Sequence, residues 1–141
     1  MSNKASGFLL VQAGERLVGL PLTQVLEVTS LGEVHRVPVI ERAMRGLVSV
    51  HGRTIPLVHL GSLLDGRPCP PLVGSVGVVI TVGGRRVCLE IEAAEILVRE
   101  PALPVPPGET LPWAIGVARY GESLVPLLDL PALSSRLMEA A

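Results

Sequence analysis

The sequence predicts a mainly β protein built from two small β-barrel lobes of about five strands each. Three features of the sequence support this fold class. Apolar residues form short runs or alternate with polar ones, which is typical of strands. The 141 residues include 15 glycines and 13 prolines, so we expect short elements and many turns. A sequence pattern of glycine, proline and apolar residues in the first half of the chain is repeated in the second half. We therefore expect two packed copies of one β unit, an arrangement that removes most exposed sheet edges.

Strand signals come in pairs that flank short glycine turns. The first pair is Phe8–Ala13 and Arg16–Leu20, separated by Gly14-Glu15, and Val25–Val28 is a further strand. Along Val87–Glu92 the residues alternate between apolar and other types, which predicts one dry and one wet face. The remaining predicted pairs are Leu47–Val50 with Thr54–Val58, Val76–Val82 with Arg86–Ile91, and Trp113–Tyr120 with Ser123–Leu128.

Helical signals are few. Val39–Arg45 has the length of one or two turns, and Leu60–Asp65 predicts a short helix before Gly66. Pro131–Ala141 predicts a C-terminal helix with proline near its first turn. Two proline-rich stretches, Gly66–Pro71 and Pro101–Pro112, predict ordered loops because proline blocks regular hydrogen bonding.

An internal repeat supports the two-lobe architecture. Gly46–Leu64 aligns without a gap on Gly116–Ser134, which pairs Pro56 with Pro126. The stretch from Gly14 aligns in the same way on the stretch from Gly83, with nearly the same shift. We therefore treat residues 1–141 as a single domain with approximate lobes at 7–67 and 72–137, between which strands can be exchanged.

The composition argues against several classes of function. The net charge is -1 and the only aromatic residues are Phe8, Trp113 and Tyr120, so nucleic-acid binding is disfavoured. The apolar run Phe8–Val11 is too short for a signal peptide or a membrane span. Cys69 and Cys88 form no CxxC pair. We therefore expect a cytoplasmic protein without membrane insertion, disulfides, metal or cofactor.

No catalytic motif is present, so we predict no catalytic residues. His51 is expected at a hairpin turn on the surface, and His59 is expected to be a polar residue at a strand end. Glu90 and Glu92 share one strand face, which we expect to be solvated. An enzyme stays open as an alternative: it would be favoured if both carboxylates were buried and converged on His59, and disfavoured if they faced solvent.

Binding is the favoured class of function. The mean hydropathy of +0.52 is high for a soluble monomer of this size. Some apolar surface is therefore expected to be covered only in a complex with another protein.

Several motifs together carry a family resemblance. They are Gly46-Leu-Val-Ser-Val-His-Gly52-Arg-Thr-Ile-Pro56-Leu-Val-His-Leu60 and, upstream, Leu20-Pro-Leu-Thr-Gln-Val-Leu-Glu-Val28, with Pro38 between them. Val78–Thr81, Val87–Glu92 and Tyr120–Leu130 follow in the order of a second lobe. Over about residues 7 to 137 this set resembles the CheW-like chemotaxis coupling domain, of which the chain is identified as a divergent member.

The resemblance implies two intertwined five-stranded β-barrels and a non-catalytic adaptor. Its expected partners are the cytoplasmic tip of a methyl-accepting chemoreceptor, the regulatory domain of a CheA-type histidine kinase and other CheW-like domains. It also implies a receptor-binding groove at Val25, Glu27, Gly46 and His51. Val25 would pack on the receptor helix, Glu27 would set its register by charge, and Gly46 would allow close approach.

The chain departs from the family pattern at several of these positions. Ser49 stands where the family has Asn, His51 where it has Arg, and His59 where it has Asp. Cys88–Glu92 replaces the family's Gly-Leu-x-Val-Asp. Because histidine lacks the planar donor fork of arginine, a second function stays open. In it, the protein binds the receptor or another CheW-like domain but not the kinase.

Overall fold

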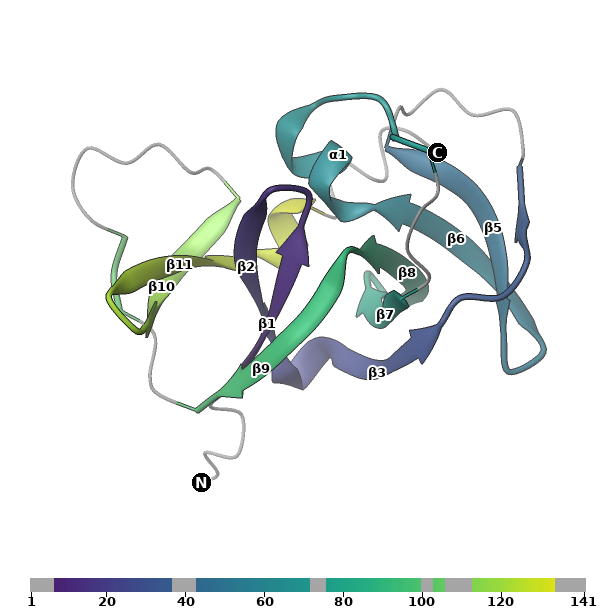
Figure 1. The fold of residues 1–141 in the computed structure, drawn as a ribbon. Helices are drawn as coiled ribbons and strands as arrows, with labels where there is room; N and C mark the ends of the chain where they lie inside the picture. Colours follow the sequence, from purple (N-terminus) through teal and green to yellow (C-terminus); the bar gives the residue numbers. More distant parts are fainter. Residues whose placement is uncertain (1–6, 37–42, 72–75, 100–102, 106–112, 134–141) are drawn as a thin grey trace.

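The computed structural model describes residues 7–36, 43–71, 76–99, 103–105 and 113–133. Within these residues the strands form two hydrogen-bonded sheets that lie side by side (Figure 1). Short helical segments are few: the 3-10 helix η1 (Leu22–Gln24), the helix α1 (Leu60–Asp65) and the helical residues 130–133.

Sheet A has the strand order β10-β11-β2-β1-β9. Its strands are β1 (Phe8–Ala13), β2 (Arg16–Pro21), β9 (Ala93–Val98), β10 (Ala114–Tyr120) and β11 (Ser123–Leu128). Sheet B has the order β3-β7-β8-β6-β5-β4. Its strands are β3 (Val25–Ser30), β4 (Val34–His35), β5 (Met44–Val50), β6 (Arg53–His59), β7 (Val76–Val82) and β8 (Arg85–Ile91).

Each sheet takes strands from both halves of the chain. In sheet A the β1–β2 hairpin pairs with β9 on one side and, in parallel, with β11 on the other, where Leu127 lies opposite Gly19. In sheet B the β7–β8 hairpin pairs with β3 and, in parallel, with β6, where Leu57 lies opposite Cys88. The two sheets therefore repeat one arrangement. The lobe boundaries at 7–67 and 72–137 stay a prediction about the repeated units.

The repeat extends to individual backbone bonds. The pairing of β5 with β6 shifts register at Gly46, and the pairing of β10 with β11 shifts at Gly116. The amide of His59 donates to the Ala43 carbonyl at 2.8 Å, and the amide of Asp129 donates to the Trp113 carbonyl at 2.6 Å. Since each member of these pairs is 70 residues from its counterpart, the structure contains the duplication that the sequence indicates.

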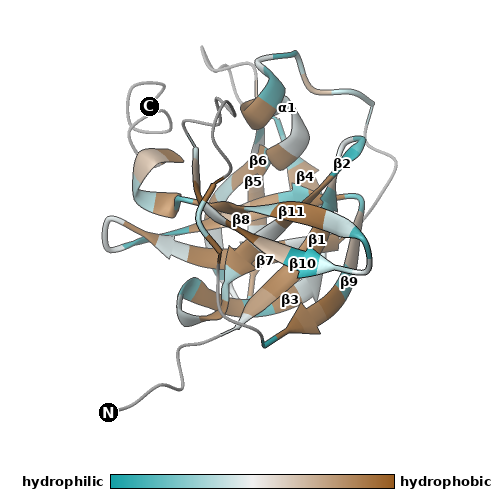
Figure 2. Cartoon of the chain, turned by 90° about the vertical axis from the view of Figure 1, so that its left-hand side faces the viewer, coloured by the Kyte–Doolittle hydropathy of each residue, from teal (hydrophilic) through white to brown (hydrophobic). Residues whose placement is uncertain are grey.

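Two apolar clusters position the candidate site. The main core lies between the sheets and α1 and consists mostly of Leu, Val and Ile. Most strands are accordingly brown, the colour of hydrophobic residues, in Figure 2. A second cluster lies on the inner side of sheet B, which we call the inner cluster of sheet B. It consists of Val48, Ile55, Leu57, Val79 and Cys88.

Most predicted elements are confirmed, and the differences are local. The predicted hairpins and the helix Leu60–Asp65 are present. The predicted helix Val39–Arg45 is wrong at Met44 and Arg45, which begin β5; its residues 39–42 lie outside the described residues. The short β4 and the half-exposed β9 were not predicted. Of the predicted C-terminal helix only residues 131–133 are described, and they are helical.

The predicted fold class is confirmed: the chain is mainly β, with two sheets and few short helices. Within the residues that the structure describes, the sheets do not close into barrels, and sheet B has a sixth strand because β4 adds to the edge of β5.

Candidate functional site

The inner cluster of sheet B opens to the surface beside the β5–β6 turn, between β3 and the first residues of β6 and β8. There a cleft of about 120 Å³ has a floor that includes the buried Ile55 and Val79. Leu26 lies at the cleft and is 49% exposed. We call this cleft the sheet B groove. It is lined by Leu26, Glu27, Val50, His51, Arg53, Ile55, Val79 and Arg86.

Two of the predicted site residues, Glu27 and His51, meet at this groove. The Nε2 atom of His51 lies 2.9 Å from Oε2 and 3.0 Å from Oε1 of Glu27. Glu27 comes from β3 and His51 from the β5–β6 turn, where it has a φ of 51° before Gly52. Sheet B therefore curls far enough for side chains of non-adjacent strands to touch. His51 is confirmed as an exposed turn residue, since its side chain is 75% exposed.

Arginine side chains flank the same groove. Because β6 and β8 are parallel neighbours, their first residues lie at one end of the sheet, which brings Arg53 close to Arg85 and Arg86. An adjoining cleft of about 690 Å³ is lined by Arg53, Thr54, Ile55, Pro56, Gly84, Arg85 and Arg86. None of the three arginines forms an ion pair with another described residue. From the sequence alone, Arg85-Arg86 after Gly83-Gly84 could bind an anion, although a charged turn is the commoner role of such a pair.

The other two predicted site residues lie elsewhere. Val25 is partly buried and packs against the main core. Gly46 has a φ of 153°, and a Cβ on it would collide with the backbone oxygen of His35 on β4. Glycine is therefore required there by the close approach of β4 to β5. The receptor-contact roles of Val25, Glu27, Gly46 and His51 stay predictions.

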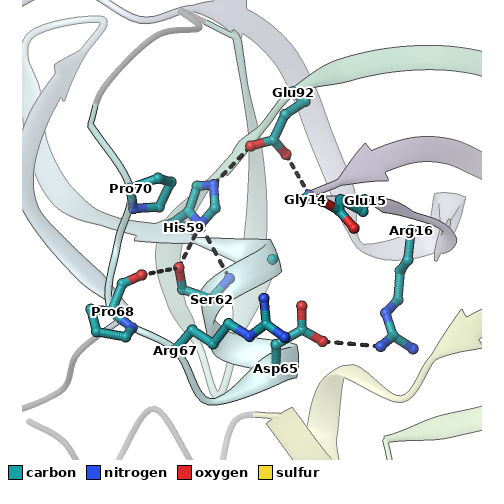
Figure 3. A pocket seen from close by; sticks show the side chains of 11 residues that line it. Gly14, Glu15, Arg16, His59, Ser62, Asp65, Arg67, Pro68, Pro70 and Glu92 are labelled. Carbon is teal, nitrogen blue, oxygen red and sulfur yellow. Dashed lines mark hydrogen bonds and ion pairs between the residues drawn. The ribbon is translucent and has the colours of Figure 1, made fainter.

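A third cleft, of about 650 Å³, lies between α1 and the β1–β2 turn (Figure 3). Its lining is polar. Arg16 forms an ion pair with Asp65 at 3.0 Å, and its guanidinium carbon lies 5.5 Å from the centroid of the Trp113 ring. His59 and Glu92 lie side by side in the lining of this cleft, with 2.9 Å between Nε2 of His59 and Oε2 of Glu92.

The hydrogen bonds of His59 define its tautomer and its role. Its Nδ1 accepts the backbone N–H of Ser62 at 3.1 Å, so the ring proton lies on Nε2, which donates to Glu92. The Ser62 hydroxyl lies 2.7 Å from Nδ1 and 3.2 Å from the Pro68 carbonyl oxygen. His59 thus caps the N-terminus of α1. Glu92 also accepts the Gly14 N–H at 2.6 Å and thereby links sheet B to the β1–β2 turn.

The carboxylates Glu90 and Glu92 do not converge. Glu90 is 4% exposed and pairs with Arg45 at 2.6 Å, so the expectation that it faces solvent is wrong. The reason is that a cation 45 residues away in sequence compensates its burial. Glu92 is 41% exposed and does contact His59, which meets only part of the condition set for an enzyme.

The two thiols are not activated. Burial, with smaller effects from the Glu90 and Glu27 carboxylates, raises the pKa of Cys88 to about 12. Burial is also the largest cause that raises the pKa of Cys69 above its usual value. Because the thiolate is the nucleophile, neither environment favours thiol chemistry near neutral pH.

Two absences apply to the described part of the chain. It contains no group of three or more His, Cys, Asp or Glu side chains that could hold a metal ion. It also contains no helix long and apolar enough to cross a membrane.

Together these features describe a small β-rich domain in which a duplicated unit forms two intertwined sheets, with open clefts on its surface. The chain belongs to the CheW-like domain family, whose model matches residues 7–138. The resemblance to the CheW-like family that the sequence carries is thereby confirmed.

The fold is similar to the crystal structure of the scaffolding protein TtCheW from Thermoanaerobacter tengcongensis. The TM-score is 0.78, the sequence identity is 19%, and the match covers 92% of each chain. No curated protein matches this chain by sequence.

Proposed function

We propose that this chain is a non-catalytic cytoplasmic adaptor that couples methyl-accepting chemoreceptors to a CheA-type histidine kinase. The observation that carries the proposal is the sheet B groove. It places Glu27 and His51, which match the family's receptor-facing positions, in contact beside an exposed apolar side chain, Leu26. An apolar floor with charged walls suits one face of an amphipathic helix, such as that of a receptor tip.

Glu27 has the clearest role in this proposal. Among the described residues that line the groove it is the one carboxylate, and its contact with His51 orients it. A fixed charge at the wall sets the register of a docked helix, because a partner group of the same sign is repelled.

We further propose that the kinase regulatory domain, or another CheW-like domain, contacts sheet A. The support is apolar surface on its edge strands and on the neighbouring β11. Ile115 is 54% exposed, Leu124 is 48% exposed and Leu97 is 48% exposed. These side chains lie on β10, β11 and β9, so they leave the sheet B groove free for a second partner.

Binding measurements with each partner separately test the function. We expect the full chain to bind both a receptor tip fragment and a kinase regulatory domain in calorimetric titrations. Glu27→Lys should weaken receptor binding, because it reverses the charge at the wall and places a cation beside His51, and it should leave kinase binding unchanged. For receptor binding, the matched control is Glu122→Lys, at the exposed β10–β11 turn of sheet A.

Three outcomes separate the readings. Binding to both partners supports the coupling function. Binding to the receptor without the kinase supports the second function, which the imidazole of His51 favours because it offers fewer donors than the guanidinium of the family's arginine. If the folded chain binds neither partner, the coupling function is excluded, and of the second function only binding to another CheW-like domain is left.

A further inference from the structure

We propose that the helix that docks in the sheet B groove carries carboxylates against Arg53 and Arg86, and that these two arginines select acidic partners. The proposal rests on the proposed function and adds the chemistry of the partner. It starts from an imbalance of charge: the protein as a whole has a net charge of -1, whereas the lining of this groove holds two guanidinium groups and one carboxylate.

Strand register directs both arginines toward the groove. Successive residues of a strand point to opposite faces, so Arg53 points to the same side of β6 as Ile55 and Leu57. In the same way Arg86 points to the same side of β8 as Cys88. Ile55, Leu57 and Cys88 all belong to the inner cluster of sheet B. Arg53 and Arg86 therefore extend that buried face to the surface, where both line the groove.

The charges of Arg53 and Arg86 are not neutralised within the described chain. Glu27, the carboxylate of the groove, is engaged by His51 at 2.9 Å, and the ion pairs of the described residues leave both arginines unpaired. By contrast, Arg45 and Arg16 both have carboxylate partners. Two unpaired guanidinium groups beside an apolar floor are complementary to a surface that is apolar in the middle and acidic at its flank.

The groove also has an orientation. Glu27 and His51 form one part of its wall, whereas Arg53 and Arg86 come from the adjacent strands β6 and β8. A helix with carboxylates on one flank fits this arrangement in one direction only, because the opposite direction would bring a carboxylate against Glu27. The arginines therefore determine both which helix binds and how it is oriented.

The first test compares charge variants in binding to a receptor tip fragment. Since Arg53 and Arg86 are exposed, the variants Arg53→Gln and Arg86→Gln should fold, which thermal unfolding checks. We expect the double variant to lose about fivefold to tenfold in affinity at low salt, since exposed ion pairs contribute modestly. The loss should shrink at high salt, where the Debye length is only a few Å. Arg119→Gln on β10 removes the same charge from sheet A and should have no effect.

The second test uses two synthetic amphipathic helical peptides that share one leucine face. One carries glutamates on a flank, and the other carries glutamines at the same positions. In NMR titrations of the full chain, the acidic peptide should shift the Nε–Hε signals of Arg53 and Arg86 more than that of Arg119. The glutamine peptide should shift them little.

The outcomes of these tests separate two kinds of failure. If the receptor tip binds with the same affinity to the native chain and the double variant, the acidic partner is excluded while the coupling function stands. If no receptor tip binds but the acidic peptide shifts both arginines, the coupling function fails and the selectivity stands. Equal shifts with the acidic and glutamine peptides would overturn the proposal, whatever the receptor does.

Discussion

His59 illustrates how one residue can change its chemistry and keep its structural role. Its counterpart in the repeat is Asp129, whose Oδ1 accepts the amide of Ala132 at 3.3 Å, as Nδ1 of His59 accepts the amide of Ser62 at 3.1 Å. Both side chains cap a short helical segment at the third residue after themselves. The sequence predicted a polar strand-end residue at position 59. It did not predict the cap, because histidine is an uncommon capping residue.

Replacement of His59 by the family's aspartate should expose the dependence on Glu92. His59→Asp keeps a capping oxygen but places a second carboxylate near that of Glu92, so we expect a loss of about 1–3 kcal/mol in unfolding free energy. Adding Glu92→Gln should recover part of the loss, since the like charges are removed. Urea unfolding of both single variants and the double variant measures the coupling. If the losses in unfolding free energy of the two single variants simply add in the double variant, the contact between positions 59 and 92 is contradicted.

The buried thiol of Cys88 gives a pH dependence with a defined sign. The pKa of Cys88 is raised to about 12 from an ordinary value of 9.0, so the unfolded chain loses this proton first as the pH rises. The stability that Cys88 contributes is therefore complete below pH 9 and is lost as the pH rises toward 12. We expect the stability of Cys88→Ala to fall less steeply than that of the native chain as the pH rises above 9. The denaturant midpoints of the native chain and of Cys88→Ala are compared between pH 8.5 and 10.5. If both midpoints fall in parallel, the thiol of Cys88 does not cause the alkaline loss of stability.

Gly46 determines whether a whole strand can join sheet B, because it allows β4 to pair with the edge of β5. Its φ of 153° and the collision of a Cβ with the His35 oxygen both exclude larger residues. We expect Gly46→Ala to lower the unfolding free energy by at least about 2 kcal/mol. Gly32→Ala is the control, since no atom lies within 4 Å of a Cβ at that position. Equal stability of the two variants in urea would show that β4 tolerates displacement.

The strand β6 is central to sheet B, and Leu57 is its fully buried residue in the inner cluster. We expect Leu57→Ala to reduce stability by roughly 2–5 kcal/mol, the range for truncation of a buried leucine. Leu124→Ala, at a leucine that is 48% exposed, should change it by less than about 1 kcal/mol. Similar losses for both variants in denaturant titrations would contradict the assignment of this core.

Elements with strong local signals could be predicted, and elements that depend on distant partners could not. The hairpins around Gly14, Gly52 and Gly121 follow from turn glycines between apolar runs. The strand β9 escaped prediction because its sequence, Ala-Ala-Glu-Ile-Leu-Val, has consecutive apolar residues and no two-residue alternation. Its place in sheet A depends on pairing with β1.

The candidate site could be predicted only in part for the same reason. The resemblance to the family suggested Glu27 and His51 as site residues, but their contact depends on the curl of sheet B. The role of Arg53 and Arg86 depends on the parallel pairing of β6 with β8, which joins the two halves of the chain. A chain-local pattern holds no information on such pairings, so the sequence did not show that Arg53 and Arg86 line one groove.

The exchange of strands makes the whole molecule one folding unit. The β1–β2 hairpin needs β9 and β11, and the β7–β8 hairpin needs β3 and β6. We therefore expect fragments 1–71 and 72–141 to be unfolded alone and to form native-like structure when they are mixed. Circular dichroism and NMR spectra of each fragment and of the mixture measure this. A well-dispersed spectrum from one fragment alone would contradict the interdependence.

The coupling function requires that one chain holds two signalling partners at once on separate surfaces, the sheet B groove and the exposed side chains of sheet A. Sedimentation velocity of the chain with a receptor tip fragment and a kinase regulatory domain tests it most directly. We expect a species that contains all three proteins, with the receptor lost on Glu27→Lys and the kinase domain retained. Competition between the two partners for the chain, so that each displaces the other, would contradict the claim.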